Sequence, residues 1–261
     1  MHYWVGSMTV VLDGKSLAEK LMKKLPRPKN KSLGIILVGD NKKSRIYINC
    51  KRDACEKAGI TFFGCYFPGD VEEWRVKKII EDWNNSDMTG ILIQLPLPER
   101  FNTREMLDLV SPDKDVDGLN SNSKFKTCTP NGMLMLLDNY NVKIKGKVVI
   151  VGYGKLVGKP LAKMLDERNI LYDVITSNTK NATQIIESAD VIFTATGVNN
   201  LIKKVKKGAV VVDAGTGDID YELIKGDCSY VTPIIGGVGP MTVYTLISNI
   251  INGGCVLDNT T

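Results

Sequence analysis

The sequence predicts an α/β protein of two domains, each built on a parallel β-sheet. Short apolar runs with the length and composition of buried strands alternate with segments that have the period of amphipathic helices. This alternation occurs as two separate series, the second starting at about residue 147. The chain has 261 residues, which is long enough for two domains of ordinary size.

The first series has the order βαβαβ. Its first helix is expected to end before Gly59, because glycine readily adopts the left-handed conformation that follows a helix. Pro96 and Pro98 prevent the third strand from continuing. Such a series predicts a parallel sheet covered by helices. The expected strands are residues 34–38, 61–67 and 90–94, and the expected helices are residues 42–57 and 71–83.

A connecting helix leads to the second series. Thr129 and Pro130 mark its start, since proline is favoured in the first turn, and we expect it to run through residues 133–139. A last helix at about 241–251 is expected to return to the first domain. The expected strands of the second series are residues 147–151, 171–176, 190–195, 209–213 and 229–232, and its helices are residues 157–168 and 182–188.

These elements predict the domain boundaries. The first domain is expected to comprise residues 1–135, completed by the C-terminal helix 242–261. The second is expected to comprise residues 136–241. Residues 1–7 are left out of the fold prediction, because Gly6-Ser7-Met8 resembles a cloning remnant before a native start.

The composition is that of a globular protein with a substantial core. Hydrophobic residues make up 43% of the chain and charged residues 24%, with a net charge of +5. The basic residues are interspersed with acids, which is not typical of nucleic-acid binding, and the run Lys203–Lys207 is interpreted as a solvated helix or loop. No apolar stretch approaches the roughly 18 residues of a membrane span, and residues 1–7 lack the layout of a secretory signal. We therefore expect a cytoplasmic protein that binds neither nucleic acid nor membrane.

Cysteine and histidine restrict the possible chemistry. The six cysteines have no Cys-x-x-Cys spacing and no accompanying histidine cluster, so we expect free thiols and no metal site. The one histidine is His2. Any proton transfer must therefore depend on Lys, Tyr, Asp, Glu or water.

Gly152, Gly154 and Gly158 follow an apolar strand and open a helix. Glycine lets the backbone turn tightly and approach a pyrophosphate, which binds to free N–H groups at the helix N-terminus. The spacing Gly-x-Gly-x-x-x-Gly is one residue longer than the common fingerprint. Because a strand precedes the turn and a helix follows it, a Rossmann-type dinucleotide-binding domain is favoured over a merely tight turn.

The next strand end predicts NADP as the cofactor. An acid there would hold a ribose 2′-hydroxyl, but residues 176–180 contain none. Ser177, Thr179 and Lys180 offer hydroxyls and a cation that suit a 2′-phosphate. An ordinary polar loop would have the same composition.

Several further residues are candidates for catalysis. Tyr47 and Lys51 lie one turn apart on a helix face and could relay a proton, although such a pair is also common in amphipathic helices. Their position before the glycine turn is the reverse of the order in short-chain dehydrogenases. Gln94 is expected at the carboxyl end of a parallel strand, where ligands bind, or as a simple loop hydrogen-bonder.

Two further segments have unusual composition. In the segment Asp113–Gly118, a solvated turn is the simpler interpretation for Asp113 and Asp115. The glycines of residues 236–242 require unusual backbone angles, a close approach to a ligand, or a hinge between domains.

Together these segments resemble the bifunctional methylenetetrahydrofolate dehydrogenase/cyclohydrolase family. The resemblance extends from about Val10 to Asn252 and lies in separate motifs that occur in the family order. These motifs are Ser44-x-x-Tyr47-x-x-x-Lys51, Ile93-Gln94-Leu95-Pro96-Leu97-Pro98, Asp113-Lys114-Asp115-Val116-Asp117-Gly118, Cys128-Thr129-Pro130-x-Gly132, and Thr232-Pro233 followed by Gly237-Val238-Gly239-Pro240-Met241-Thr242. It implies a folate-binding domain, a Rossmann domain and a homodimer.

The resemblance also implies residue roles. Lys51 would be catalytic, assisted by Gln94 and by Tyr47, which would also lie against the folate. Asp117 would hold the amino-pyrimidine edge of the pterin through two parallel hydrogen bonds. Gly239 and Pro240 would contact the substrate as well. The residues implied to bind NADP are Gly152, Tyr153, Gly154, Lys155, Val157, Gly158, Ser177, Thr179, Thr196, Gly197 and Thr242.

The implied reaction has two steps. The first oxidises 5,10-methylenetetrahydrofolate to the methenyl form with NADP, and the second hydrolyses that product to 10-formyltetrahydrofolate. Tyr153 and Gly154 depart from the Arg and Ser that the family commonly carries, which puts the cofactor preference in question. A dehydrogenase without cyclohydrolase activity and a dinucleotide-binding regulator without turnover are the alternatives.

Overall fold

The computed structural model describes residues 9–215 and 217–253; residues 1–7, set aside above, lie outside this range, as does His2. The chain forms two compact units. One comprises the residues up to Lys20 together with Thr129–Thr242, and the other comprises Leu21–Cys128 together with the residues from Val243 onward. The two-domain α/β fold with parallel sheets is confirmed.

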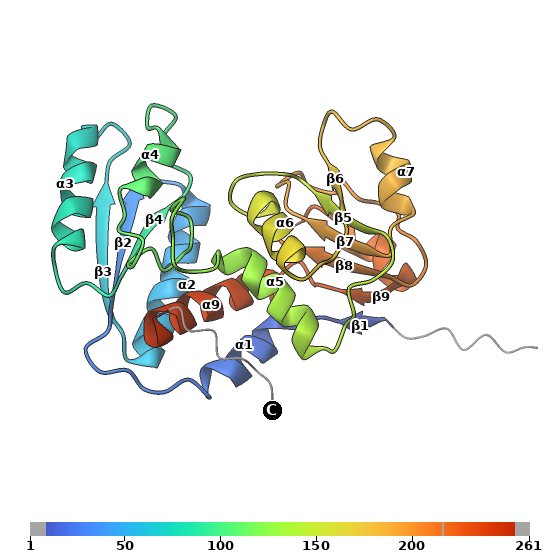
Figure 1. Cartoon of the computed structure of the whole chain (residues 1–261), viewed down its shortest axis with the longest axis horizontal. Coiled ribbons are helices and arrows are strands. Elements are labelled where there is room, and N and C mark those ends of the chain that lie inside the picture. Colours follow the sequence, from blue (N-terminus) through green and yellow to red (C-terminus); the bar gives the residue numbers. More distant parts are fainter. Residues whose placement is uncertain (1–8, 216, 254–261) are drawn as a thin grey trace, which may run out of the picture. The chain divides into compact units, whose positions relative to one another are not determined.

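The unit formed by Leu21–Cys128 is built on a three-stranded parallel sheet in the order β3-β2-β4 (Figure 1). One face of the sheet, with Leu33 and Ile35, packs on α2 and α9. The other face, with Ile36 and Ile93, packs on α3 and α4. The strands are β2 (Ser32–Val38), β3 (Thr61–Phe67) and β4 (Gly90–Gln94), and the helices are α2 (Lys42–Ala58), α3 (Glu73–Asn84) and α4 (Thr103–Asp108).

The ends of α2 follow from local sequence. Asn41 caps the N-terminus, where its side chain accepts a hydrogen bond from the Ser44 N–H at 3.0 Å. Gly59 ends the helix with φ +77°, the left-handed conformation expected of it. These two residues fix the helix that carries Tyr47 and Lys51.

The second unit contains a six-stranded parallel sheet in the order β1-β9-β8-β7-β5-β6. The order reverses at β5, since β6 lies on one side of it and β7 on the other, and Figure 1 shows α6 and α7 on opposite sides of these strands. The strands are β1 (Val10–Val11), β5 (Val148–Val151), β6 (Asp173–Ile175), β7 (Val191–Thr194), β8 (Ala209–Asp213) and β9 (Cys228–Val231). The helices are α1 (Gly14–Met22), α5 (Cys128–Asn139), α6 (Gly158–Glu167), α7 (Ala182–Glu187), α8 (Tyr221–Ile224) and the 3₁₀ turn Lys225–Asp227. The last helix, α9 (Val238–Asn252), begins in this unit, but its residues from Val243 onward belong to the other one.

The start of the chain differs from the expected boundary of residues 1–135. Val10 pairs with Tyr230 and Val11 with Val231, so β1 is an edge strand of the six-stranded sheet. Leu12 continues this pairing through a hydrogen bond from its N–H to the Val231 carbonyl at 2.8 Å. A strand of two residues has no periodicity to detect, which is why the sequence patterns did not show it.

The last helix also differs from expectation. α9 begins at Val238, three residues before the predicted start, so Gly239 and Pro240 belong to its first turn rather than to a loop. Proline fits there because the first N–H groups of a helix have no partner within it. Gly236 precedes the helix with φ +87°.

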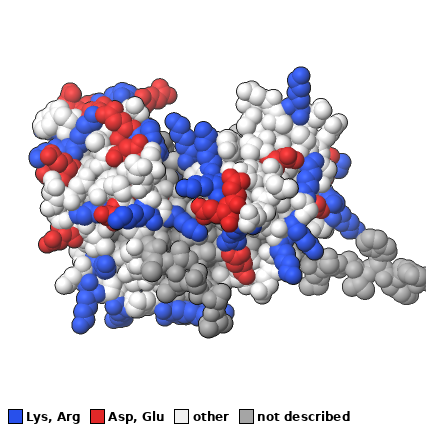
Figure 2. Space-filling model, in the orientation of Figure 1, with Lys and Arg blue, Asp and Glu red and all other residues white. Residues whose placement is uncertain are grey.

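The charged side chains are mixed on the face shown in Figure 2, where blue and red groups alternate within each unit. None of the described helices is long and apolar enough to cross a membrane. The described cysteines, Cys50, Cys55, Cys65, Cys128 and Cys228, are free thiols, as predicted.

Candidate cofactor and catalytic sites

The glycine-rich turn between β5 and α6 needs two of its three glycines for packing. Gly152 has φ +94°, and a Cβ on it would lie 2.9 Å from the Ala195 carbonyl oxygen. A Cβ on Gly158 would lie 2.1 Å from the Gly152 carbonyl oxygen. No atom lies within 4 Å of a Cβ built on Gly154. Gly152 and Gly158 therefore bring the helix and turn together, whereas Gly154 leaves open space.

The N-terminus of α6 lies at the point where the sheet order reverses. Its N-cap residue, Val157, makes no side-chain capping hydrogen bond. A helix N-terminus carries partial positive charge and N–H groups that can bind a pyrophosphate. In parallel sheets, ligands bind at the carboxyl ends of the strands where the order reverses. The turn therefore has the position and the donors of a dinucleotide site.

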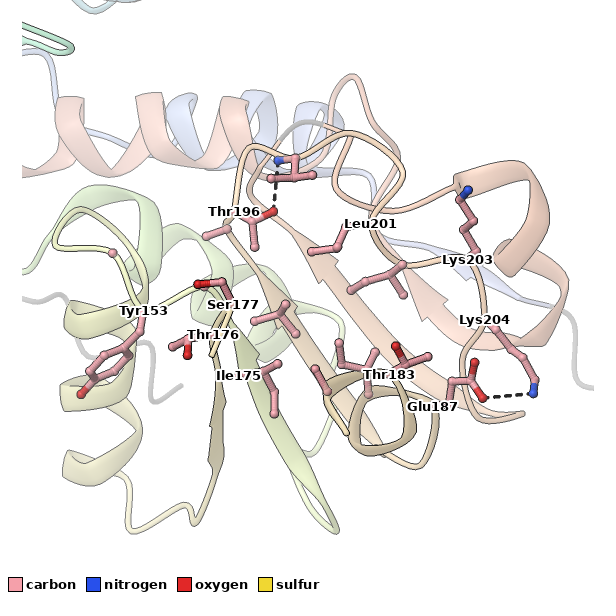
Figure 3. A pocket seen from close by; sticks show the side chains of 18 residues that line it. Tyr153, Ile175, Thr176, Ser177, Thr183, Glu187, Thr196, Leu201, Lys203 and Lys204 are labelled. Carbon is pink, nitrogen blue, oxygen red and sulfur yellow. Dashed lines mark hydrogen bonds and ion pairs between the residues drawn. The ribbon is translucent and has the colours of Figure 1, made fainter. Parts of the chain in front are cut away.

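A cavity of about 710 Å³ lies beside this turn (Figure 3). Its size is that of a pocket for a cofactor-sized ligand. Of the residues expected to bind the cofactor, those that line it are Gly152, Tyr153, Gly154, Ser177 and Thr196. Lys155, Val157, Gly158, Thr179, Gly197 and Thr242 do not line it. Gly197 nevertheless lies between two lining residues, Thr196 and Val198.

The segment after β6 forms a compact polar turn. The Thr176 N–H donates to the Thr179 hydroxyl at 2.9 Å, and the Asn178 N–H donates to the Thr176 hydroxyl at 3.3 Å. Thr179 thus shapes the turn from within, while Ser177 is exposed and faces the cavity. Lys180 is exposed at the end of the turn.

Sequence reasoning missed two lysines at this cavity. Lys203 and Lys204 line it and are exposed in a loop, as expected, but their position next to α7 was not foreseen. Lys204 pairs with Glu187 at 3.0 Å, and Figure 3 shows this pair on the opposite side of the cavity from Tyr153. No local pattern distinguishes these lysines from others in the run, so only the fold could place them.

The other unit brings Lys51 and Gln94 together. Lys51 is 6% exposed, and its Nζ donates to Oε1 of Gln94 at 3.0 Å. Nε2 of Gln94 donates to the Leu95 carbonyl at 3.0 Å, and the Ser44 hydroxyl donates to the same carbonyl at 3.1 Å. Gln94 is the last residue of β4. The buried Nζ of Lys51 is therefore held by an amide at the carboxyl end of a parallel strand.

Tyr47 lies one helical turn before Lys51 and is 39% exposed. The buried face of α2 consists of Ser44, Ile48, Lys51 and Cys55. Tyr47 is therefore free to contact a ligand at the surface, while Lys51 is enclosed.

The segment Asp113–Gly118 is more enclosed than predicted. Asp113 is exposed and paired with Lys124, in agreement with a solvated turn. Asp115, in contrast, is 4% exposed, and its Oδ2 accepts the Asn120 N–H at 2.7 Å. The interpretation of Asp115 as solvated is therefore wrong, because its carboxylate organises the turn from inside. Burial, with a smaller effect of the Asp117 charge, raises the pKa of Asp115 to about 6.

Lys114 has a structural function in this segment. Its Nζ donates to the carbonyls of Trp83, Asn84 and Ser86, at 3.1, 2.9 and 2.5 Å. These carbonyls lie at the end of α3, where a cation is favourable.

The thiol of Cys128 responds to the charges of both Asp117 and Lys51. Its N–H donates to the Asp117 carbonyl at 3.1 Å. Burial and then the charge of Asp117 raise the pKa of the Cys128 thiol well above its usual range, while the charge of Lys51 opposes them. Asp117 and Lys51 thus both act on the same buried side chain. Gly239 and Pro240 belong to the other unit.

The fold and these two sites define a class of protein. It is a two-unit α/β protein in which a Rossmann-type unit has a dinucleotide turn and cavity, and a second unit holds a buried lysine–glutamine pair.

Comparison with known proteins identifies the family. The catalytic domain of tetrahydrofolate dehydrogenase/cyclohydrolase matches residues 12–117, and the NAD(P)-binding domain of the same family matches residues 127–255. The chain belongs to this family. A relative from Aquifex aeolicus, named bifunctional protein FolD, is 39% identical over 93% of this chain and 94% of its own length. A relative of the same name from Listeria innocua is 34% identical over 93% of this chain and 96% of its own length.

Solved structures agree with this assignment. The bifunctional FolD enzyme from Campylobacter jejuni, titled methylenetetrahydrofolate dehydrogenase/cyclohydrolase, has a TM-score of 0.88 at 33% identity, covering 94% of this chain and 98% of its own. The FolD enzyme from Trypanosoma brucei, complexed with NADP and an inhibitor, has a TM-score of 0.87 at 27% identity, covering 94% of this chain and 97% of its own. The resemblance in the sequence motifs is therefore confirmed.

Proposed function

We propose that this protein oxidises 5,10-methylenetetrahydrofolate to 5,10-methenyltetrahydrofolate with NADP and hydrolyses the product to 10-formyltetrahydrofolate. The observation that carries the proposal is the buried pair of Lys51 and Gln94, with a 3.0 Å hydrogen bond at the end of β4. It is supported by family membership over both matched domains. The nicotinamide cofactor accepts the hydride when bound, and the chain supplies geometry and proton transfer.

In the proposed mechanism, some residues of the folate unit bind the substrate and others transfer the proton. Asp117 anchors the amino-pyrimidine edge of the pterin, and Tyr47 packs against the folate. Fixed orientation is the main requirement of hydride transfer. Lys51 takes the proton from the water that attacks the methenyl carbon, and returns it to the ring nitrogen whose bond to that carbon breaks when the ring opens. Gln94 keeps the Lys51 amino group aligned through the hydrogen bond to Oε1.

Substitution of Lys51 by Met tests this assignment. The substituted side chain keeps a similar length but cannot transfer a proton. We expect the hydrolysis of methenyltetrahydrofolate to fall to the spontaneous rate while the folate affinity changes little. Lys57 is a matched control, because it is exposed in the last turn of the same helix. Wild-type hydrolysis by Lys51→Met would refute the role of Lys51.

The same assays separate the alternatives. A monofunctional dehydrogenase would reduce NADP with methylenetetrahydrofolate but hydrolyse the methenyl compound only at the background rate. A regulator would bind both ligands without producing the absorbance of reduced nicotinamide. The retained Lys51 and Gln94 favour two activities.

NADP is the proposed cofactor because the turn after β6 contains no carboxylate. Ser177 faces the cavity, and Lys180 lies at the end of the turn. Both suit a 2′-phosphate, although Tyr153 supplies no cation where the family commonly has arginine. We expect a preference for NADP of about tenfold, or about 1.4 kcal/mol. Specificity constants measured with both cofactors test it, and a preference for NAD would refute it.

We also propose a cytoplasmic homodimer. The edge strand β3 has one neighbour in its sheet and exposes Phe63 by 47% and Tyr66 by 49%. An open edge with exposed aromatic side chains suits pairing with the same strand of a second copy. Phe63→Lys should shift the sedimentation coefficient from dimer to monomer. Leu171→Lys is the control, since Leu171 is 90% exposed in the other unit.

A further inference from the structure

The loop after β7 forms one wall of the cofactor cavity. Ala195, Thr196 and Val198 line the cavity, and Gly197 between them has φ +72° (Figure 3). The Val198 N–H donates to the Thr196 hydroxyl at 3.1 Å. The loop is exposed from Gly197 onward. A wall of this kind needs an internal attachment to keep its shape.

One carboxylate oxygen provides that attachment. Oδ2 of Asp218 accepts the Thr196 N–H at 2.6 Å and the Thr194 hydroxyl at 2.6 Å. Asp218 has 0% of its surface exposed. It therefore holds the last residue of β7 and the first part of the loop from the interior of the protein, and it does not reach the solvent.

A second carboxylate shapes the segment that carries Asp218. Oδ1 of Asp213 accepts the Gly215 N–H at 2.7 Å, and its Oδ2 accepts the N–H groups of Gly217 and Asp218 at 2.9 and 3.1 Å. The Asp213 N–H donates to the Thr232 hydroxyl at 2.8 Å. The position of Asp218 is thus determined by contacts with β8 and the end of β9.

Stability alone does not account for a carboxylate at this position. No lysine or arginine among the described residues pairs with Asp218, and its Oδ1 has no hydrogen-bond partner there. A buried charge without a cation costs free energy. Burial, and to a smaller extent the charge of Asp218, raises the pKa of Asp213. This carboxylate instead accepts the two short hydrogen bonds that hold Thr194 and Thr196 of the cavity loop.

We infer that Asp218 is a positioning residue for the cofactor, because it fixes the loop from Thr194 to Thr196 in the shape that forms the cavity wall. The inference rests on the proposed function, since it assigns the cavity to the dinucleotide. Asp218 does not touch the cavity itself. Its removal should therefore weaken cofactor binding through Thr196, without changing the chemistry of Lys51.

The two proposed activities provide the test. Oxidation requires the cofactor, whereas hydrolysis of methenyltetrahydrofolate does not. Asp218→Ala leaves two donors without an acceptor, and we expect at least a tenfold weaker NADP affinity by calorimetry and a similar rise in the KM for NADP. The rate of hydrolysis should stay within about twofold of the wild type. Asp218→Asn retains an acceptor oxygen for the Thr196 N–H and should recover part of the affinity.

Asp220 is the matched control. It lies two residues further along, caps α8 through the Leu223 N–H at 3.3 Å, and does not line the cavity. Asp220→Ala should leave NADP affinity unchanged. Wild-type NADP affinity in Asp218→Ala, or an equal loss of hydrolysis and affinity in both Asp218 variants, would overturn the inference. If the wild-type protein bound NADP but showed neither activity, the proposed function would fail while calorimetry still tested Asp218.

Discussion

Single carboxylates in the Asp113–Gly118 segment have different functions although they are only two residues apart. Asp113 is paired at the surface, Asp115 is buried inside the turn, and Asp117 is partly accessible. Burial separates a side chain that organises the turn from one that is available to a ligand.

The buried Asp115 predicts a specific dependence of stability on pH. Its pKa is raised to about 6 in the folded protein, against about 3.9 in an unfolded chain. A raised carboxyl pKa means that the folded state keeps its proton longer. Stability from this group is therefore complete below about pH 4 and is lost as the pH rises towards 6. The loss is about 3 kcal/mol at about 1.4 kcal/mol per pH unit.

Asp115→Asn should remove this dependence, because the amide keeps an acceptor for the Asn120 N–H without a titrating proton. Urea unfolding of both proteins at pH 4 and pH 7 measures it. We expect the unfolding free energy of the variant to improve relative to the wild type by about 3 kcal/mol over that interval. A constant difference at both pH values would show that Asp115 does not titrate in this range.

Asp117→Ala should weaken folate binding and reduce both activities together, because the anchor is common to both steps. The loss of one charged hydrogen-bonded anchor costs about 2–4 kcal/mol. Calorimetry with a folate substrate analogue measures it. Asp113→Ala is the control in the same turn, and unchanged affinity in Asp117→Ala would assign the whole segment a structural function.

At the scale of elements, the glycine turn combines required and permissive positions. Gly158 cannot accept a Cβ, which would lie 2.1 Å from the Gly152 carbonyl, whereas Gly154 has open space. Gly158→Ala should therefore displace α6 from the turn and lower NADP affinity by more than tenfold, while Gly154→Ala should change it by less than threefold. Fluorescence titration with NADPH compares them. Similar affinities in the two variants would contradict this account of the turn.

The open space at Gly154 also predicts how the cofactor preference can be changed. Tyr153→Arg combined with Gly154→Ser introduces a cation and a hydroxyl beside the cavity, and the backbone leaves room for the serine. An arginine can bind a 2′-phosphate with two donors. The ratio of specificity constants for NADP over NAD should rise at least tenfold. Tyr153→Phe is the control, and an unchanged ratio in the double variant would place the 2′-phosphate elsewhere.

At the scale of the whole molecule, the net charge of +5 affects the binding of anionic ligands. Exposed lysines contribute through solvent, where salt screens them over about 8–10 Å at physiological strength. The advantage of NADP over NAD should therefore decrease as the salt concentration is raised from about 20 mM to about 500 mM. Specificity constants at both concentrations measure it. If the ratio did not change, cations would not hold the 2′-phosphate.

The sequence by itself determined the elements and the family. Strands such as residues 61–67, 90–94 and 209–213 have patterns that depend only on near neighbours, and they agree with β3, β4 and β8. The separation of Tyr47 and Lys51 by one helical turn, and the glycine turn after β5, are equally local. Periodicity and backbone restrictions act over a few residues, so they can be read without the fold.

The tertiary structure decided what depends on residues far apart in the chain. It paired β1 with β9 across more than 200 residues, enclosed Asp115, and brought Lys204 to Glu187 at the cofactor cavity. It also brought the buried carboxylate of Asp218 into hydrogen-bond contact with the Thr196 N–H. A polar side chain has the same local signature whether it is solvated or buried. Its environment is set by which distant segments pack around it, and only the folded chain shows that.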